Sequence, residues 1–486
     1  MGQIIIKLLI GQLIQRYGRD KPEQKLIISG LTQILAAIFF YFFFFNFITD
    51  LLLRNQMQFK ENGYLFKIWK SIPVTVNVWA FQIENESKYL KNLELPRLTE
   101  IGPFVFRGHR NRIILEWSEQ KNLIKFNESI KLRFDSSKSI GPLSIRIKTF
   151  NNFISINNQS INLSNQTEQI VENIELFKKL SIEELLQLKP SSSLENDDNQ
   201  SSISSSIFYQ TIEPNEMVIN LRQKSHTERF NHFRFDRFPV ENYSDYGIVS
   251  SLSCSNSLQE SEGTFFGLYT LNEIEKFILN PNFYCKPMRF VFESDSKFDL
   301  IQTQRFEMDT QQFSLYEKSN WCHCPEYLRE DDCEGVFHLR QCHPRSPFVL
   351  SNVHFLQTKH LHKLIRGLHP DRNKHLGFFE FEPITGVTLK SIVRVQWNVD
   401  LRSTMASINL KPIVLPYFWI EESFLIDDTL KFLLQADSII FTLSSYFYAA
   451  LGTFGGCCLA IGLFRWLKLY LKKRNSITAL PILNNK

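Results

Sequence analysis

The sequence lacks the spaced motifs by which common enzyme classes are recognised. It contains no G-x-S-x-G elbow, no Walker loop and no H-E-x-x-H pair. Scattered serine, histidine and aspartate residues carry no information without such spacing. We therefore expect a protein that is not an enzyme and that uses no cofactor. No internal repeat is visible along the chain either, so a repeat architecture is not expected.

Charged residues are absent from two long stretches. Residues 26–49 form a run of 24 and residues 438–464 a run of 27. At about 1.5 Å per residue, a helix of either length exceeds the roughly 30 Å hydrocarbon core of a bilayer. We predict two transmembrane helices, 26–53 and 438–464. A cleaved signal peptide fits poorly, since the first stretch is too long for that role and begins after 25 other residues.

The residues beside these stretches predict the orientation. The preceding tail, 1–25, carries five basic and two acidic residues, and the following tail, 465–486, carries six basic residues and no acidic one. Basic flanks favour the cytosol, so both termini are expected there, in a multi-pass membrane protein. Residues 54–437 then face the exterior or an organelle lumen. The two tails carry +3 and +6 and the rest of the chain −4, so the net charge of +5 gives no support to nucleic-acid binding.

Cysteine is scarce, and six of the eight cysteines lie outside the apolar stretches, all within residues 54–437. An even number in an oxidising compartment predicts disulfides, although the sequence alone leaves about 15 pairings open. Their neighbours His323, His338 and His343 have the ligand types that suit zinc, but the first cysteine pair is spaced too closely for a usual zinc site. We expect no metal and three ordinary polar histidines. The six are Cys254, Cys285, Cys322, Cys324, Cys333 and Cys342.

Seven N-x-[ST] sequons also lie between the apolar stretches, and none lies in a tail. This placement agrees with a lumenal or extracellular segment, where such asparagines accept glycans. Because the chain is rich in Asn and Ser, we expect roughly half of the sequons to be used. They are Asn85, Asn127, Asn158, Asn162, Asn165, Asn199 and Asn242.

Alternating apolar residues predict strands through much of residues 54–437. In "VRVQWNVDL", residues 393–401, the apolar side chains share one face, which predicts a strand with one buried face. Helical patterns are fewer. "SIEELLQL", residues 181–188, begins with a serine N-cap and has a glutamate three residues on, and "LNEIEKFIL", residues 271–279, is a second predicted helix. Residues 190–206 hold too few apolar side chains to order themselves and are expected to form an exposed loop.

Two small features stand out in the second apolar stretch. Gly452 and Gly456 form a G-x-x-x-G pattern, which lets helices approach closely, although glycine is common in membrane helices. Cys457 and Cys458 lie toward its cytosolic end, where they are either palmitoylated or fill small apolar positions.

Four segments resemble motifs of one known family: "VWAFQIEN" (78–85), "EIGPFVFR" (100–107), "RGLHPDRNKHLGFFEFEPITGVTL" (366–389) and "IVLPYFWIEES" (413–423). Successive cysteines of the six are 31, 37, 2, 9 and 9 residues apart, which follows the order of the same family. With two end helices and a sequon-rich segment between them, the chain resembles the class B scavenger receptors. That family includes the fatty-acid translocase of platelets and the lysosomal integral membrane protein type 2.

The resemblance implies an α+β ectodomain with an antiparallel β-barrel-like core, short helices and a helical apex at about 150–210, anchored by two transmembrane helices. It also implies three disulfides, each contributing about 2–4 kcal/mol by constraining the unfolded chain. The implied pairs are Cys254–Cys322, Cys285–Cys342 and Cys324–Cys333.

The function implied by the resemblance is that of a receptor for lipids, fatty acids, sterols or lipoproteins that passes lipid through a hydrophobic tunnel to the membrane. A dry channel spares an acyl chain a loss of about 0.8 kcal/mol per CH₂ in water. "GTFFGLYT", residues 263–270, stands where the family has an aromatic loop with prolines, which are missing here. It predicts Phe265, Phe266 and Leu268 at the tunnel mouth, with plain core packing as the alternative.

A second reading is a lysosomal or endosomal membrane receptor that sorts a protein cargo bound at the apex. The lysosomal member of the family has an acidic residue ahead of a dileucine pair near its end. The tail here has Ile482 and Leu483 with no acid before them. Lipid handling at the plasma membrane or in endosomes is therefore favoured, while a lysosomal location is the alternative.

Overall fold

The computed structural model describes residues 22–40, 63–118, 123–151, 176–186, 217–222, 234–238, 260–261, 275–279, 286, 288–317, 320–321, 324, 329–339, 348–402, 411 and 413–478. The chain divides into two compact units. One is Phe59–Asp427, and the other combines Met1–Gln58 with Asp428–Lys486.

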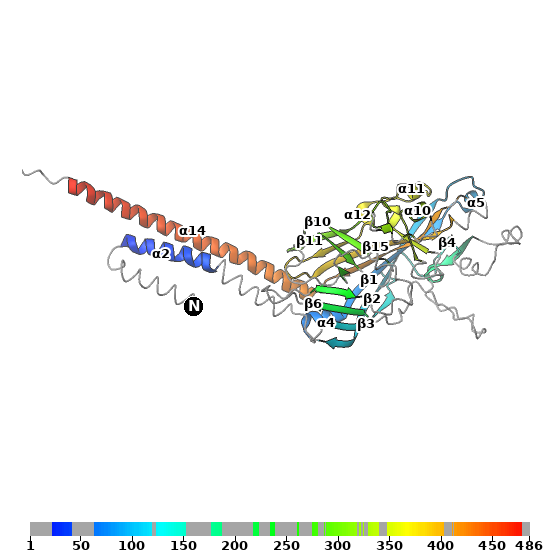
Figure 1. The fold of residues 1–486 in the computed structure, drawn as a ribbon, viewed down its shortest axis with the longest axis horizontal. Coiled ribbons are helices and arrows are strands. Elements are labelled where there is room, and N and C mark those ends of the chain that lie inside the picture. Colours follow the sequence, from blue (N-terminus) through cyan, green and yellow to red (C-terminus); the bar gives the residue numbers. More distant parts are fainter. Residues whose placement is uncertain are drawn as a thin grey trace, which may run out of the picture. The chain divides into compact units, whose positions relative to one another are not determined.

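A sheet of 14 strands forms the centre of the unit Phe59–Asp427 (Figure 1). Its main path runs β7-β6-β3-β2-β1-β16-β15-β14-β11-β10-β9-β8, while β13 pairs with β15 and β12 with β13. Every described strand pair is antiparallel except β8–β9. The strands of this sheet are β1 (Ser71–Ile83), β2 (Leu98–Ser118), β3 (Leu123–Phe134), β6 (Met217–Arg222), β7 (Arg234–Phe238), β8 (Glu260–Ser261), β9 (Lys276–Leu279), β10 (Met288–Phe298), β11 (Ile301–Met308), β12 (Phe337–His338), β13 (Phe348–Ser351), β14 (Phe378–Phe381), β15 (Thr388–Asp400) and β16 (Val414–Leu425).

The predicted α+β class with a large antiparallel core is confirmed, but the barrel is not closed. The edge strands β7 and β8 contact each other, yet within the described residues no ladder of hydrogen bonds joins them. Most of the predicted helical apex, 150–210, lies outside the described residues. Its described part holds one strand of a two-stranded sheet, formed by β4 (Arg146–Phe150) and β5 (Phe177–Ser181), and the short helix α8 (Ile182–Leu185).

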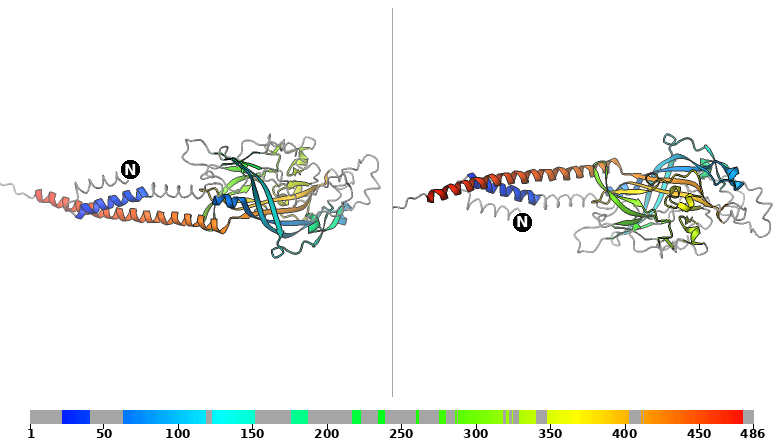
Figure 2. Two further views of the ribbon diagram at one scale, coloured as in Figure 1. Left: turned by 90° about the horizontal axis from the view of Figure 1, so that it is seen from below. Right: turned by 90° about the horizontal axis from the view of Figure 1, so that it is seen from above.

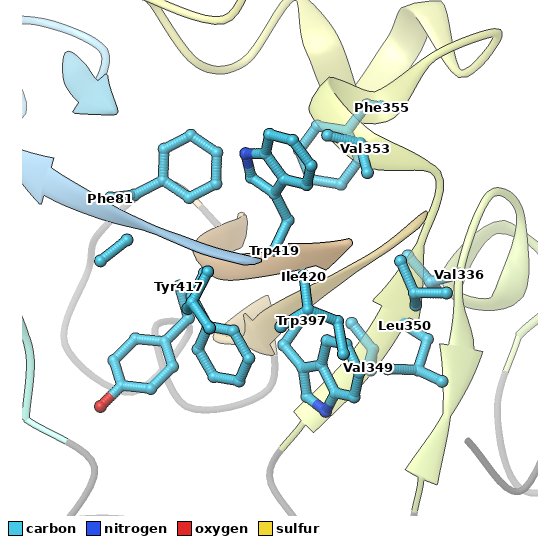
Figure 3. Packing of buried hydrophobic residues seen from close by; sticks show 14 of the residues in the cluster. Phe81, Val336, Val349, Leu350, Val353, Phe355, Trp397, Tyr417, Trp419 and Ile420 are labelled. Carbon is cyan, nitrogen blue, oxygen red and sulfur yellow. The ribbon is translucent and has the colours of Figure 1, made fainter. Parts of the chain in front are cut away.

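Strand β15 differs from the prediction in one respect, because both of its faces are buried. Eight consecutive residues, 392–399, are buried, including Gln396 and Asn398. The polar residues that alternate with the apolar ones in β15, such as Gln396 and Asn398, face a second packed layer and not water. Figure 3 shows Trp397 and Trp419 on opposite sides of the β15–β16 pair, with Val353 and Phe355 on the side of Trp419.

The helices of this unit are short, and their caps are local. The predicted cap of α8 is confirmed: Ser181 Oγ accepts a hydrogen bond from the Glu184 N–H, and the Glu184 carboxylate accepts one from the Ser181 N–H. The short helices are α4 (Tyr64–Lys70), α5 (Glu86–Leu90), α8, α10 (Glu330–Cys333), η7 (Val353–Phe355), α11 (Lys359–His362) and α12 (Arg372–His375).

The predicted helix at residues 271–279 is wrong in its described part, because Lys276–Leu279 form strand β9. Phe277 and Leu279 are buried, and β9 pairs with β10. A short pattern with apolar residues at both spacings fits a helix and a strand equally well, so tertiary contacts decide between them.

The described residues of the second unit form the helices α2 (Pro22–Phe39) and α14 (Asp428–Thr478), which lie side by side in Figures 1 and 2. Among the described residues one helical segment is long and apolar enough to cross a membrane, Leu443–Asn475. It overlaps the predicted span 438–464 and extends beyond it. The first predicted span, 26–53, is described only as far as residue 40 and stays a prediction.

Glycines mediate the contact between these helices, but not the pair that the sequence pattern indicated. A Cβ on Gly30 would lie 2.6 Å from the Gly455 carbonyl oxygen, and one on Gly462 would lie 2.7 Å from Ile27 Cγ1. Nothing lies within 4 Å of a Cβ on Gly456. The close approach therefore uses Gly30, Gly455 and Gly462, because residues seven apart return to one helix face.

Candidate functional site

Five buried phenylalanines from four neighbouring strands line one part of the sheet. They come from β9, β10, β11 and β14, whose inward-facing positions the pleat brings together. The ring centroids of their contacting pairs lie 4.8–5.6 Å apart, in stacked and edge-to-face arrangements. This apolar interior is formed by Phe277, Phe290, Phe306, Phe379 and Phe381.

A pair of tryptophans lies on the neighbouring strands β1 and β16. Trp79 and Trp419 are directly opposite in the register, and their rings stack with centroids 3.8 Å apart. Gly102 makes room for this pair, since a Cβ at that position would lie 2.6 Å from Trp79 Cδ1. Trp419 Nε1 donates a hydrogen bond of 2.8 Å to Glu100 Oε2, so the stack fixes the place of a carboxylate.

His354, from the short helix η7 that packs on the sheet, contacts the same carboxylate. Its Nε2 lies 2.7 Å from Glu100 Oε2, and its Nδ1 accepts a hydrogen bond of 2.9 Å from the His369 N–H. Because Nδ1 is an acceptor, Nε2 carries the proton and donates it toward Glu100. His354 has a positive φ of 52°, an uncommon backbone conformation, and its N–H donates to Gln396 Oε1 at 2.8 Å.

His375 completes the group, with its ring centroid 4.2 Å from that of His354. Its Nδ1 accepts a hydrogen bond of 3.0 Å from the Asp371 N–H, which belongs to the N-cap residue of α12. Burial, together with the neighbouring His354, lowers the pKa of His375 to about 4. His375 is therefore neutral at physiological and mildly acidic pH. We call Glu100, His354, His375 and Trp419 the histidine cluster.

Glu100 is ionised in this setting. Burial by itself would raise its pKa, but the hydrogen bonds from His354 and Trp419 and the nearby imidazoles hold the pKa below its ordinary value. Two donors on one carboxylate oxygen stabilise the charge that burial penalises. The histidine cluster thus provides two donors for the Glu100 carboxylate and a hydrogen-bond partner for both ring nitrogens of His354.

The histidine cluster joins a covering layer to the sheet. His354 comes from η7 and His375 from α12, while Glu100 and Trp419 come from β2 and β16. Gln396 extends the network, because its Nε2 donates to Asn398 Oδ1 at 2.7 Å. Within the described residues neither imidazole hydrogen-bonds to a serine, threonine or cysteine side chain.

The part of the chain that the structure describes contains no group of three His, Cys, Asp or Glu side chains placed to hold a metal ion. His338 lies in strand β12, not in a loop, and its Nε2 is 3.2 Å from the Asp332 carbonyl oxygen. His323 and His343 fall outside the described residues.

One predicted disulfide is present: Cys324 and Cys333 are bonded, with Cα atoms 5.6 Å apart. The other four cysteines of the middle segment lie outside the described residues, as do the predicted tunnel-mouth residues Phe265, Phe266 and Leu268. Cys457 and Cys458 are free cysteines on α14, so neither of their two predicted roles is tested.

Among the sequons, the side chain of Asn85 already has three hydrogen bonds. Its Nδ2 donates to Glu94 Oε2 at 3.1 Å and to the Leu95 carbonyl at 3.0 Å, and its Oδ1 accepts from the Arg97 N–H. A glycan replaces one of the two Nδ2 hydrogens, so glycosylation would break one of these bonds. Asn127 lies in strand β3, and the remaining sequons, Asn158, Asn162, Asn165, Asn199 and Asn242, lie outside the described residues.

Sequence reasoning missed the histidine cluster. Glu100 and His375 do fall within two of the segments that resemble family motifs, which was the available signal. Their meeting could not be foreseen, because Glu100 and His354 are 254 residues apart in the chain.

The described residues combine a large α+β domain, built on an antiparallel sheet, with one helical segment that is long and apolar enough to cross a membrane, which is the class of architecture expected of a membrane-anchored protein. The model of the CD36 family matches residues 27–466, and the chain belongs to that family. The resemblance to the class B scavenger receptors is thereby confirmed.

Individual relatives agree with this assignment. The chain is 22% identical to Lysosome membrane protein 2 of Mus musculus over 468 residues, covering 91% of this chain and 92% of that protein. It is 23% identical to Sensory neuron membrane protein 1 of Apis mellifera, with 81% of each chain covered. It is 24% identical to Scavenger receptor class B member 1 of Bos taurus, covering 77% of this chain and 75% of that protein.

Proposed function

We propose that the protein is a membrane receptor that binds lipid or lipoprotein and passes lipid through a hydrophobic tunnel in residues 54–437 to the bilayer. The observation that carries the proposal is the match to the CD36 family over residues 27–466, with a relative named as a scavenger receptor. The phenylalanine-lined interior gives it physical support, because apolar walls stabilise an acyl chain by about 0.8 kcal/mol per CH₂ removed from water.

The topology that this function needs has two membrane spans, 26–53 and 438–464, with both tails in the cytosol. The apolar segment Leu443–Asn475 supports the second of them. The first rests on the uncharged run at residues 26–49. The location is the plasma membrane or the endosome and lysosome, and a relative named as a lysosome membrane protein supports the latter. Protease protection in sealed vesicles, with tags on both tails, tests this topology: cleavage of either tag from the lumenal side contradicts it.

The lipid proposal is tested on the full-length chain purified in a mild detergent. Native mass spectra before and after lipid extraction should show a bound, extractable lipid. A photoreactive fatty acid should then crosslink to the peptide containing Phe265, Phe266 and Leu268, and unlabelled fatty acid should compete for that site. A lipid-free mass together with no saturable crosslinking of fatty acid, sterol or phospholipid would overturn the proposal.

The protein-cargo reading is the alternative, with binding at the apex formed by residues 150–210. It predicts saturable binding of a lumenal protein to the full-length chain that persists after complete lipid extraction. Loss of that binding on replacement of the surface residues between 150 and 210, with lipid content unchanged, would separate the two readings.

A further inference from the structure

A small cavity beside the Cys324–Cys333 disulfide contains a buried lysine. The lining residues are Lys286, Gln312, Phe313, Leu315, Asn320, Cys333, Val336 and Phe337, and we call this the Lys286 cavity. Its volume is about 10 Å³, which is room for one water-sized guest. An acyl chain, or a carboxylate with its substituent, is too large for it.

The charge of Lys286 is not balanced by an acid in the cavity. Lys286 is only 2% exposed, and its Nζ faces two aromatic rings, 5.6 Å from the centroid of Phe313 and 5.4 Å from that of Phe337. Ring faces attract a cation but do not neutralise it. Among the described lining residues none is acidic.

The charged groups that act on Lys286 do not neutralise its positive charge. Asp309 attracts the ammonium, but its carboxylate is bound to Arg289, whose Nε lies 2.6 Å from Asp309 Oδ2. Glu334, on the α10 side, accepts a hydrogen bond from the Leu315 N–H. The charges that shift the Lys286 pKa are those of Arg289 and Asp309, and Glu334 is not among them. Lys286, Arg289 and Asp309 together sum to one net positive charge, which a single monovalent anion would balance.

Gln312 supplies a polar group at the same cavity. It is 2% exposed, and neither its Nε2 nor its Oε1 has a hydrogen-bond partner. Asn320, by contrast, donates from its Nδ2 to the Gln311 and Ser314 carbonyls. A buried amide without a partner costs about 1–3 kcal/mol, and a guest that accepts from Nε2 removes part of that cost.

The structure assigns to the Lys286 cavity the binding of one monovalent anion of halide size, held by the Lys286 ammonium and the Gln312 amide. Chloride, a monatomic anion a little larger than a water molecule, is abundant in extracellular and lumenal fluids. The proposal concerns an ion site and is independent of lipid binding and transfer.

Binding should depend on pH in a defined direction. Burial, followed by the nearby Arg289, lowers the pKa of Lys286 to about 7, with Asp309 opposing the shift. The ammonium that attracts the anion is therefore present in mildly acidic solution and lost in alkaline solution. The anion should bind well near pH 6 and weakly near pH 9.

The first test compares the thermal midpoint of the full-length chain in sodium bromide or chloride with that in sodium gluconate, whose anion is too large for the cavity. At equal ionic strength of about 0.15 M and near pH 6, the halide should raise the midpoint by roughly 2 °C in a saturable manner. The rise should disappear near pH 9 and in Lys286→Met, and should fall in Gln312→Leu. Lys297→Met, which removes an exposed lysine from β10, should leave it unchanged.

The second test needs no variant and therefore stands even if Lys286→Met fails to fold. Crystals of the protein grown or soaked in bromide should show an anomalous peak within contact distance of Lys286 Nζ and Gln312 Nε2. A midpoint that is the same in halide and gluconate, or a halide effect that survives Lys286→Met, overturns the proposal. A cavity guest without anomalous signal, which identifies a water molecule, overturns it as well.

Discussion

The histidine cluster and the Lys286 cavity are both buried and both charged, but they balance charge in different ways. In the histidine cluster, Glu100 receives hydrogen bonds from His354 and Trp419. In the Lys286 cavity, the ammonium faces two phenyl rings, and the acid nearest in effect, Asp309, is already bound to Arg289. The first site provides its carboxylate with two donors, whereas the described residues that line the second include no acid to balance Lys286.

The difference separates a structural role from a binding role. A buried charge with all its partners ties elements together, and removing any member exposes the cost of the others. Where a buried charge has no counter-charge, the folded protein is stabilised by a guest of opposite charge, and it is also stabilised when the charged side chain is replaced by an apolar one. Substitutions of similar size should therefore change stability in opposite directions at the two sites.

The largest effect is expected from Glu100→Leu. This change leaves the Nε2 proton of His354 and the Nε1 proton of Trp419 buried without an acceptor, so the free energy of unfolding should fall by about 3–5 kcal/mol. Chemical denaturation of the full-length chain measures it. Glu116→Leu, an exposed position on the same strand, is the matched control and should change stability by less than about 0.5 kcal/mol. If the two changes lowered the unfolding free energy equally, the hydrogen bonds of Glu100 in the histidine cluster would not stabilise the fold as we infer.

Lys286→Met should have the opposite sign. In gluconate, without a halide, the replacement removes an unbalanced buried charge and keeps the side-chain volume, so the unfolding free energy should rise by about 1–3 kcal/mol. The same denaturation experiment, with Lys297→Met as the control, measures the change. A loss of stability as large as that of Glu100→Leu would mean that Lys286 has a counter-charge within the protein.

The pH dependence of stability should show two separate windows. The folded pKa of His375, about 4, is below its ordinary value of 6.5, so its contribution is present above pH 6.5 and is lost as the pH falls toward 4. The loss should reach about 1–2 kcal/mol after allowance for solvent screening. The lowered pKa of Glu100 adds a further loss in acid. For Lys286, the folded pKa of about 7 is below 10.5, so its contribution appears as the pH rises from 7 to 10.5.

His375→Asn separates these windows, since an amide oxygen can still accept from the Asp371 N–H but does not titrate. Thermal midpoints measured from acid to alkaline pH should lose part of the acid slope in this variant and keep the alkaline one. An acid slope identical to that of the unmodified protein would show that His375 titrates normally in the folded state.

The smallest effect should come from a polar pair at the surface. Ser181→Ala removes one half of the capping box of α8 and should cost about 1 kcal/mol. Ser136→Ala, an exposed serine in a turn, serves as the control. If Ser181→Ala lowered the unfolding free energy as much as Glu100→Leu, burial could not be the reason for the large effect of Glu100→Leu.

Features that depend on neighbouring residues were predictable. The capping box at Ser181 and Glu184 was read from residues three positions apart, and the apolar segment of α14 from its uncharged run. The family was recognised from segments of 8–24 residues and from cysteine spacing, and the match over residues 27–466 confirms it. Hydrogen bonds between near neighbours and hydropathy are properties of short stretches, which the sequence states directly.

Features that depend on distant contacts were not predictable in the same way. Residues Lys276–Leu279 became a strand because β10 offers a pairing edge, and β15 is buried on both faces, with η7 packed on the side of Gln396. The sequence pattern indicated Gly456 as a contact of α14, but the structure places Gly455 against α2, because the position of α2 decides which face of α14 is in contact.

The sequence by itself therefore determined the apolar segment of the second predicted span and the helix cap, because each follows from local composition and spacing. The family was recognised from its motifs, and the antiparallel class of the large domain was implied by that resemblance. Only the tertiary structure decided that Glu100 meets His354 across 254 residues and that Lys286 faces two rings beside an unpartnered Gln312. Burial gives a charge its energetic consequence, and burial is set by which distant elements pack together.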